Sequence, residues 1–74
     1  MNIFGERLLE TLKRNGISQY RLAQELGLTT RAVNLWVLGK REPDFDMLIR
    51  LARRLNTTTD YLLGVDKLNT GGKL

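Results

Sequence analysis

Side chains that cap helix N-termini alternate along this 74-residue chain with residues that end helices. The caps are Ser18, Thr29, Asp44 and Thr58, and the ends are Gly16, Gly27, Gly39 and Asn56. Capping side chains accept backbone N–H groups of the first turn, whereas Gly and Asn tolerate the left-handed conformation in which helices often end. Because apolar residues recur at helical spacing between these signals, the pattern predicts five short helices and no strand.

The predicted helices follow these boundaries. They cover residues 3–14, the segment from Ser18 to Gly27, residues 30–38, the segment from Asp44 to Asn56, and a short turn after Thr58. Isolated helices under about 12–15 residues are marginal in water, so tertiary packing must hold them. The chain has no Cys and no His, which excludes disulfides and the usual zinc sites and removes the side chains of most small-enzyme mechanisms. Stability must therefore come from a packed apolar core.

We expect this core to collect inward-facing side chains from all five helices. They are Phe4, Leu8, Leu12, Leu22, Leu26, Val33, Trp36, Leu48, Leu51, Leu55 and Leu62. The spacing also places Phe45 inward, one turn before Leu48. Trp36 and Tyr61 could in principle stack on bases, but inward-facing aromatic residues are more often part of a core. The predicted fold class is all-α, a compact five-helix domain over residues 1–65.

The end of the chain, residues 66–74, is polar, contains Gly71-Gly72 and has no helical periodicity. We expect it to be a flexible tail, or a linker in a longer protein. No apolar stretch approaches the roughly 18 residues that cross a bilayer, and Glu6 and Arg7 interrupt the start of the chain. The sequence thus favours a cytoplasmic, intracellular protein with no membrane span.

Positive charge is concentrated in the middle of the sequence. Between Thr11 and Arg41 there are six basic residues and one acidic residue, Glu25, while the rest of the chain has six basic and seven acidic residues. The basic residues of the middle segment are Lys13, Arg14, Arg21, Arg31, Lys40 and Arg41. Such an excess favours an anionic partner such as nucleic acid.

The second and third predicted helices are joined by a turn of only a few residues, so they must cross steeply. Ala23 is small where the two helices approach, and Gly27 supplies the left-handed turn residue. The crossing leaves the first turn and outer face of the third helix protruding. Its side chains are Thr29, Thr30, Arg31, Asn34 and Leu35, which suit the edges of bases in a major groove.

Several motifs carry a resemblance to a known family. They are Ser18-Gln19, Leu22-Ala23, Gly27 before a Thr-capped helix, Trp36, Gly39-Lys40-Arg41 with Pro43 close behind, Leu51-Ala52, and Tyr61-Leu62-Leu63-Gly64. From about residue 6 to residue 64, the chain resembles the Cro/CI-type helix-turn-helix domains of phage repressors and bacterial regulators, the lambda-repressor-like or XRE family. The resemblance implies a five-helix domain that docks its third helix, residues 30–38, in the major groove of an operator, usually as a homodimer.

The resemblance also implies roles for single residues. Gln19 matches a phosphate contact, and Lys40 and Arg41 match the loop that touches the DNA backbone beyond the third helix. Thr30 and Arg31 match base-reading positions, with Leu35 one turn further along. The dimer surface is not identified by the sequence, and Leu38, Val65 and Leu68 are candidates.

Each of these side chains also has a plainer interpretation. Arg31 could be a solvated surface residue, but a cation in the first turn of a helix is unfavourable, so base recognition is favoured. Leu35 could contact a thymine methyl group or be an ordinary exposed leucine, with neither preferred. Thr29 is a cap first and a phosphate contact second, and Asn34 could read adenine, touch phosphate or be solvated. Arg50, Arg53 and Arg54 are interpreted as a solvated face of the fourth helix.

The sequence therefore favours a sequence-specific double-stranded DNA-binding regulator, more specifically a repressor. One alternative is a protein–protein interaction module, antitoxin-like or coactivator-like, that keeps the fold without reading DNA. A second is an architectural DNA binder without sequence preference. No enzyme activity, cofactor, metal or small-molecule ligand is expected.

Overall fold

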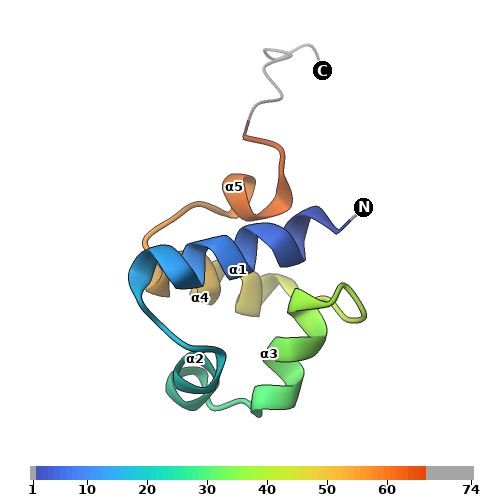
Figure 1. Cartoon of the computed structure of the whole chain (residues 1–74). Helices are drawn as coiled ribbons and strands as arrows, with labels where there is room; N and C mark the ends of the chain where they lie inside the picture. The colour runs from blue at the N-terminus through green and yellow to red at the C-terminus, as the bar shows by residue number, and fades with distance from the viewer. Residues whose placement is uncertain (1, 67–74) are drawn as a thin grey trace.

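The computed structural model describes residues 2–66, and these form five α-helices (Figure 1). They are α1 (Ile3–Asn15), α2 (Gln19–Leu26), α3 (Thr30–Val37), α4 (Phe45–Arg54) and α5 (Thr59–Leu63). α1 runs across the middle of the molecule with α5 above it, α4 behind it, and α2 and α3 below (Figure 1). The all-α, five-helix prediction is confirmed. No helix among the described residues is long and apolar enough to span a bilayer.

The predicted boundaries reflect local hydrogen bonds. Each predicted cap accepts a backbone N–H three residues later, and the pairs are Ser18 with Arg21, Thr29 with Ala32, Asp44 with Met47 and Thr58 with Tyr61. Asn56 has a positive φ of 57°, as expected for a residue that ends a helix. α3 is one residue shorter than predicted, because Leu38 is its C-cap and the chain turns at Gly39 with φ 77°.

The buried side chains form one cluster between the helices. They are Leu8, Leu12, Leu22, Ala23, Val33, Trp36, Leu48, Leu51, Ala52, Leu55 and Leu62, with Phe4 and Leu26 partly buried against them. The hydroxyl of Thr11 is also buried, and it donates to the carbonyl oxygen of Arg7 at 2.7 Å. The predicted core is therefore largely correct.

The prediction for Phe45 is wrong, because its side chain is 85% exposed. Phe45 does lie on the apolar stripe of α4, one turn before Leu48, but it is the first residue of the helix. At this end the apolar stripe extends beyond the core, and Phe45 lines a groove of about 150 Å³ together with Phe4 and Leu63. Helical spacing assigns a residue to a face and does not say whether another element covers that face.

An ion-pair network joins α2 to α4. The guanidinium of Arg54 donates to both carboxylate oxygens of Glu25, and Arg21 donates to one of them at 3.0 Å. The hydrogen bonds from Arg54 hold the pKa of the Glu25 carboxyl below its usual value. Desolvation opposes this lowering of the pKa, and the bond from Arg21 adds to it. The sequence predicted that three arginines form a solvated face of α4. Arg50 and Arg53 are exposed and have no ion pair among the described residues, as predicted, whereas Arg54 pairs with Glu25 of α2.

Candidate nucleic-acid interface

The turn between α2 and α3 is built by backbone bonds around a left-handed glycine. Gly27 has φ 73°, and the N–H of Leu28 donates back to the carbonyl of Ala23 at 2.8 Å. Thr29 then starts α3 by accepting the N–H of Ala32 at 3.1 Å. The two helices bury Ala23 and Val33 in the core, so the outer face of α3 is left free. This is the protruding helix that the sequence predicted.

The predicted site residues lie on the start of α2, on α3 and in the loop that follows. Six are exposed, namely Thr29, Thr30, Arg31, Asn34, Lys40 and Arg41, and two are half-buried, Gln19 and Leu35. The amide of Asn34 donates to Oε1 of Gln19 at 3.3 Å, which joins the first turn of α2 to the middle of α3. Because the side chain of Leu35 is half-buried, it is not the exposed leucine that the sequence analysis considered.

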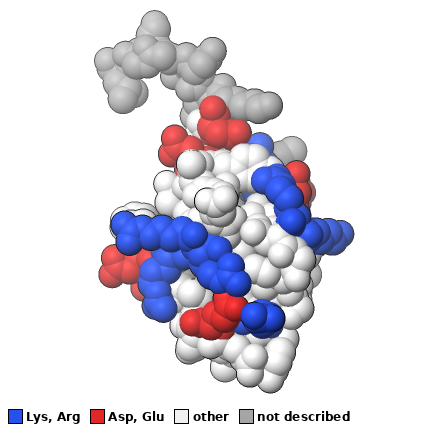
Figure 2. Space-filling view, turned by 90° about the vertical axis from the view of Figure 1, so that its left-hand side faces the viewer, with Lys and Arg blue, Asp and Glu red and all other residues white. Residues whose placement is uncertain are grey.

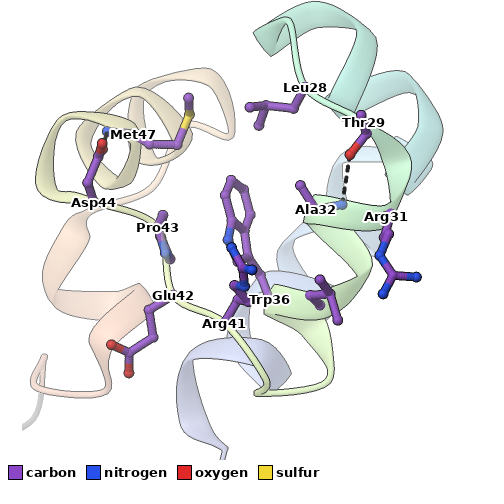
Figure 3. Close-up of a pocket in the computed structure, with 11 residues that line it drawn as sticks. Leu28, Thr29, Arg31, Ala32, Trp36, Arg41, Glu42, Pro43, Asp44 and Met47 are labelled. Atoms are coloured by element: carbon purple, nitrogen blue, oxygen red, sulfur yellow. Dashed lines mark hydrogen bonds between the residues drawn. The ribbon is translucent and has the colours of Figure 1, made fainter.

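Four of these residues meet around a hollow between α3 and the start of α4 (Figure 3). The hollow has a volume of about 410 Å³, and Thr29, Arg31, Leu35 and Arg41 contribute to its lining. The ring of Trp36 lies between α3 and the segment that leads into α4 (Figure 3). Thr30 and Lys40 are exposed but do not line this hollow.

The opposite wall of the hollow could not be predicted from the sequence. It is formed by Glu42, Pro43, Asp44 and Met47. The sequence marks Pro43 and Asp44 only as a helix start, and no periodicity relates this segment to α3. Of the charged residues that line the hollow, Arg31 lies on α3, whereas Arg41, Glu42 and Asp44 lie on the segment that leads into α4 (Figure 3).

The cations of the middle segment are divided between two parts of the surface. Arg14 pairs with Glu10 on α1, and Arg21 pairs with Glu25. In contrast, Arg31, Lys40 and Arg41 have no ion-pair partner within the described part of the chain. An unpaired exposed cation can approach a phosphate without first giving up a carboxylate.

Figure 2 shows the side of the molecule that lies on the left in Figure 1. Basic side chains cross this side, but acidic ones lie directly beside them (Figure 2). Because Arg31, Lys40 and Arg41 have no ion pair within the described part of the chain, they are the stronger candidates for a contact with an anion. Within residues 2–66, no cluster of three or more His, Cys, Asp or Glu side chains could hold a metal ion.

Comparison with known proteins identifies the family. A sequence model described as Helix-turn-helix matches residues 8–62, which include all of α2, α3 and α4. The chain belongs to this helix-turn-helix family. The predicted Cro/CI-type membership is confirmed, and because this is a family of DNA-binding regulators rather than enzymes, so is the expectation that the chain is not an enzyme.

Curated relatives of this helix-turn-helix domain are transcriptional regulators. The chain is 41% identical over 61 residues to the SPbeta prophage-derived uncharacterized HTH-type transcriptional regulator YonR of Bacillus subtilis (strain 168), covering 82% of this chain and 56% of the relative. It is 34% identical over 65 residues to the HTH-type transcriptional regulator ImmR of the same organism, covering 88% and 51%. Identity to the Repressor protein C2 of Salmonella phage P22 is 31% over 68 residues, covering 92% and 32%.

A solved structure shares the fold. The solution structure of the SOS-response transcriptional repressor LexA from Eubacterium rectale superposes with a TM-score of 0.79 at 27% identity, covering 90% of this chain and 71% of that chain. The chain spans about half the length of its Bacillus relatives. Of the predicted tail, residues 66–74, only Asp66 is among the described residues, where it pairs with Arg7 at 3.1 Å.

Proposed function

We propose that this helix-turn-helix domain binds double-stranded DNA sequence-specifically by inserting α3 into the major groove, and that it acts as a repressor. The observation that carries the proposal is the free outer face of α3, where Arg31 is exposed and unpaired, followed directly by the unpaired cations Lys40 and Arg41. The repressor role is supported by the names of two similar proteins, the phage repressor C2 and LexA.

In this proposal the site residues divide by chemistry. Arg31 reads a base, because its planar guanidinium can donate two hydrogen bonds to guanine, and Thr30 lies beside it in the first turn. Lys40 and Arg41 neutralise phosphates and set the register of the domain on the duplex. Leu35, which lines the hollow, makes an apolar contact with a thymine methyl group in this proposal.

The polar residues at the start of α2 and α3 support this arrangement. Gln19 contacts phosphate at the N-terminus of α2 and orients Asn34 through the hydrogen bond between their amides. Thr29 remains a cap first, since its hydroxyl already accepts the N–H of Ala32, and a phosphate contact second. Residues 1–65 are the DNA-binding domain, residues 66–74 a tail or linker, and the site of action is the nucleoid.

A titration with a randomised pool of duplexes tests the function. Fluorescence anisotropy at about 50 and 200 mM salt, with sequencing of the retained DNA, should give an enriched motif and an affinity that falls with salt. Salt-sensitive binding without enrichment would favour the architectural alternative. No binding at either salt would leave the protein–protein module, an antitoxin-like or coactivator-like domain.

We further propose that two copies bind as a homodimer through an apolar edge beside the end of α3, formed by Phe4, Leu38, Phe45 and Leu63. Phe4, Phe45 and Leu63 line the groove of about 150 Å³, and Phe4 and Leu38 line a neighbouring hollow. A two-fold pair on DNA has its recognition helices about 34 Å apart, so its contact surface must lie beside α3. Of the candidates from the sequence, Leu38 belongs to this edge, Val65 is partly exposed nearby in the chain, and Leu68 lies outside the described residues.

Charge along this edge favours a second copy as the partner. Lys40 and Arg41 are followed by acidic residues at every second position, namely Glu42, Asp44 and Asp46. An antiparallel two-fold contact can set the cations of one copy against the carboxylates of the other, as self-complementary interfaces require. Four side chains cover much less than the roughly 800 Å² per partner of a stable interface, so we expect the pair to form on DNA rather than in solution.

The substitution Phe45→Ser is expected to remove cooperativity between two half-sites while leaving the affinity for one half-site unchanged. Anisotropy with duplexes carrying one or two half-sites measures both quantities. Ile49→Ser is the matched control, because Ile49 is 42% exposed on the same helix and lines neither hollow of the apolar edge. Undiminished cooperativity in Phe45→Ser would contradict this interface.

A further inference from the structure

The side chain of Asn2 joins the first turn of α1 to the last turn of α3. Its Oδ1 accepts the N–H of Gly5 at 3.1 Å, which caps α1. Its Nδ2 donates to the carbonyl oxygen of Val37 at 2.8 Å, across a sequence separation of 35 residues. Both polar atoms of one amide are thus used, one within a helix and the other between two helices.

The carbonyl oxygen of Val37, in the last turn of α3, accepts no backbone hydrogen bond from the residues that follow it. The last carbonyls of a helix have no N–H of a following turn to accept. At the end of α3, Leu38 donates to Asn34, Gly39 donates to Trp36, and both Lys40 and Arg41 donate to Leu35. None of the N–H groups of residues 38–41 goes to Val37, so the amide of Asn2 supplies a bond that the loop does not.

The backbone around Asn2 is shaped for this amide. A Cβ at Gly5 would lie 2.3 Å from both Nδ2 of Asn2 and the carbonyl oxygen of Val37. A Cβ at Gly39 would lie 2.7 Å from Cγ of Asn2. Two glycines, one on α1 and one just after α3, therefore leave the space in which the side chain reaches from one helix to the other.

The hydrogen bond between Asn2 and Val37 affects the candidate interface because the loop with Lys40 and Arg41 follows directly after the end of α3. The start of α1 and the end of α3 lie toward the same side of the molecule (Figure 1). Lys40 and Arg41 leave α3 within four residues of the carbonyl that Asn2 holds, and the N–H of each is bound to Leu35 in the same last turn. α3 as a whole packs against both α2 and α1.

We propose that Asn2 is a positioning residue for DNA binding, which holds the end of α3 so that Lys40 and Arg41 meet the phosphates in register. The inference rests on the proposed function of α3 and its loop. Asn2 itself touches no DNA, and it acts through the carbonyl of Val37. Phosphate contacts depend on such fixed geometry because they set the orientation of the recognition helix on the duplex.

Two substitutions separate this role from helix capping. Asn2→Asp keeps an oxygen that can cap α1, and the ionised carboxylate has no N–H to donate to Val37. Asn2→Ser also keeps a capping oxygen, carries no charge, and is too short to span both partners. Asn56→Asp is the charge-matched control, because Asn56 is exposed between α4 and α5.

At a temperature where all variants are fully folded, Asn2→Asp and Asn2→Ser should bind the selected duplex about fivefold to tenfold more weakly than the wild type. The slope of the logarithm of affinity against the logarithm of salt concentration should decrease by about one, which corresponds to the loss of one phosphate contact. Asn56→Asp should keep the wild-type slope. Wild-type affinity and slope in both Asn2 variants would overturn the proposal.

Hydrogen exchange gives a readout that does not depend on DNA. The amides of Gly39, Lys40 and Arg41 should exchange faster in Asn2→Asp than in the wild type, because the last turn of α3 loses its tie to α1. Unchanged exchange of these amides would overturn the positioning role. If the wild type binds no duplex while these amides do respond, the proposed DNA-binding function fails and the coupling of α1 to α3 stands.

Discussion

Replacing Trp36 with alanine is expected to lower the free energy of unfolding by about 3–5 kcal/mol. The side chain is only 6% exposed, and its ring lies between α3 and the segment that leads into α4 (Figure 3). Its removal leaves a cavity that the surrounding helices can fill only partly by moving toward it. A domain of this size has a total stability near the low end of about 5–15 kcal/mol, so most of it would be lost. Urea unfolding followed by circular dichroism measures the change.

An aromatic residue on the surface provides the control for Trp36. Tyr20 is 60% exposed on α2, and Tyr20→Ala is expected to change the free energy of unfolding by less than about 0.5 kcal/mol. Trp36→Phe keeps much of the buried volume and should fall between the two. A loss below about 1 kcal/mol in Trp36→Ala would mean that the ring is not part of the cooperative core.

Replacing Arg31 with alanine is expected to remove sequence preference at one base position, reducing discrimination there by about 1–3 kcal/mol. The guanidinium is exposed in the first turn of α3 and has no ion pair among the described residues, so its side chain is free to bind a base. Lys40→Ala should instead weaken binding to all sequences evenly and lower the salt slope by about one. Affinities for the selected duplex and its single-base variants distinguish the two effects.

The control for Arg31 removes the same charge elsewhere. Arg53 is exposed on α4 without an ion pair in the described part of the chain, and Arg53→Ala should keep the base preference of the wild type. If Arg31→Ala weakened every duplex equally, the domain would be an architectural DNA binder. If it changed no affinity, the face of α3 would serve a protein partner instead.

The helix boundaries could be predicted from the sequence because they depend on bonds between near neighbours. Ser18 and Thr29 each bind an N–H three residues away, and Gly27 ends α2 because it adopts a positive φ without strain. The exposed face of α3 followed from the same local information, since a short turn forces a steep crossing. The amino-acid sequence alone therefore predicts which face of α3 is exposed and which residue types it carries.

The partners of the charged residues could not be predicted in this way. The sequence places Arg21 and Arg31 in one basic segment, yet Arg21 is paired with Glu25 and Arg31 has no ion pair among the described residues. Glu25 of α2 also pairs with Arg54, which lies at the end of α4 and is far from Glu25 in the sequence. Coulombic pairing depends on distance in space, and sequence separation carries little information about that distance.

The sequence by itself determined the five helices, most of the core and the face of α3, because capping, helical spacing and turn geometry act over a few residues. The family followed from the resemblance of its motifs to those of known proteins. The tertiary structure decided the rest. It left Phe45 exposed because no other helix of the described chain covers the start of α4, and it brought Glu42 and Asp44 opposite α3 to complete the hollow. It also placed Asn2 against the carbonyl of Val37, since only packing of α1 on α3 brings residues so far apart in the chain to hydrogen-bond distance.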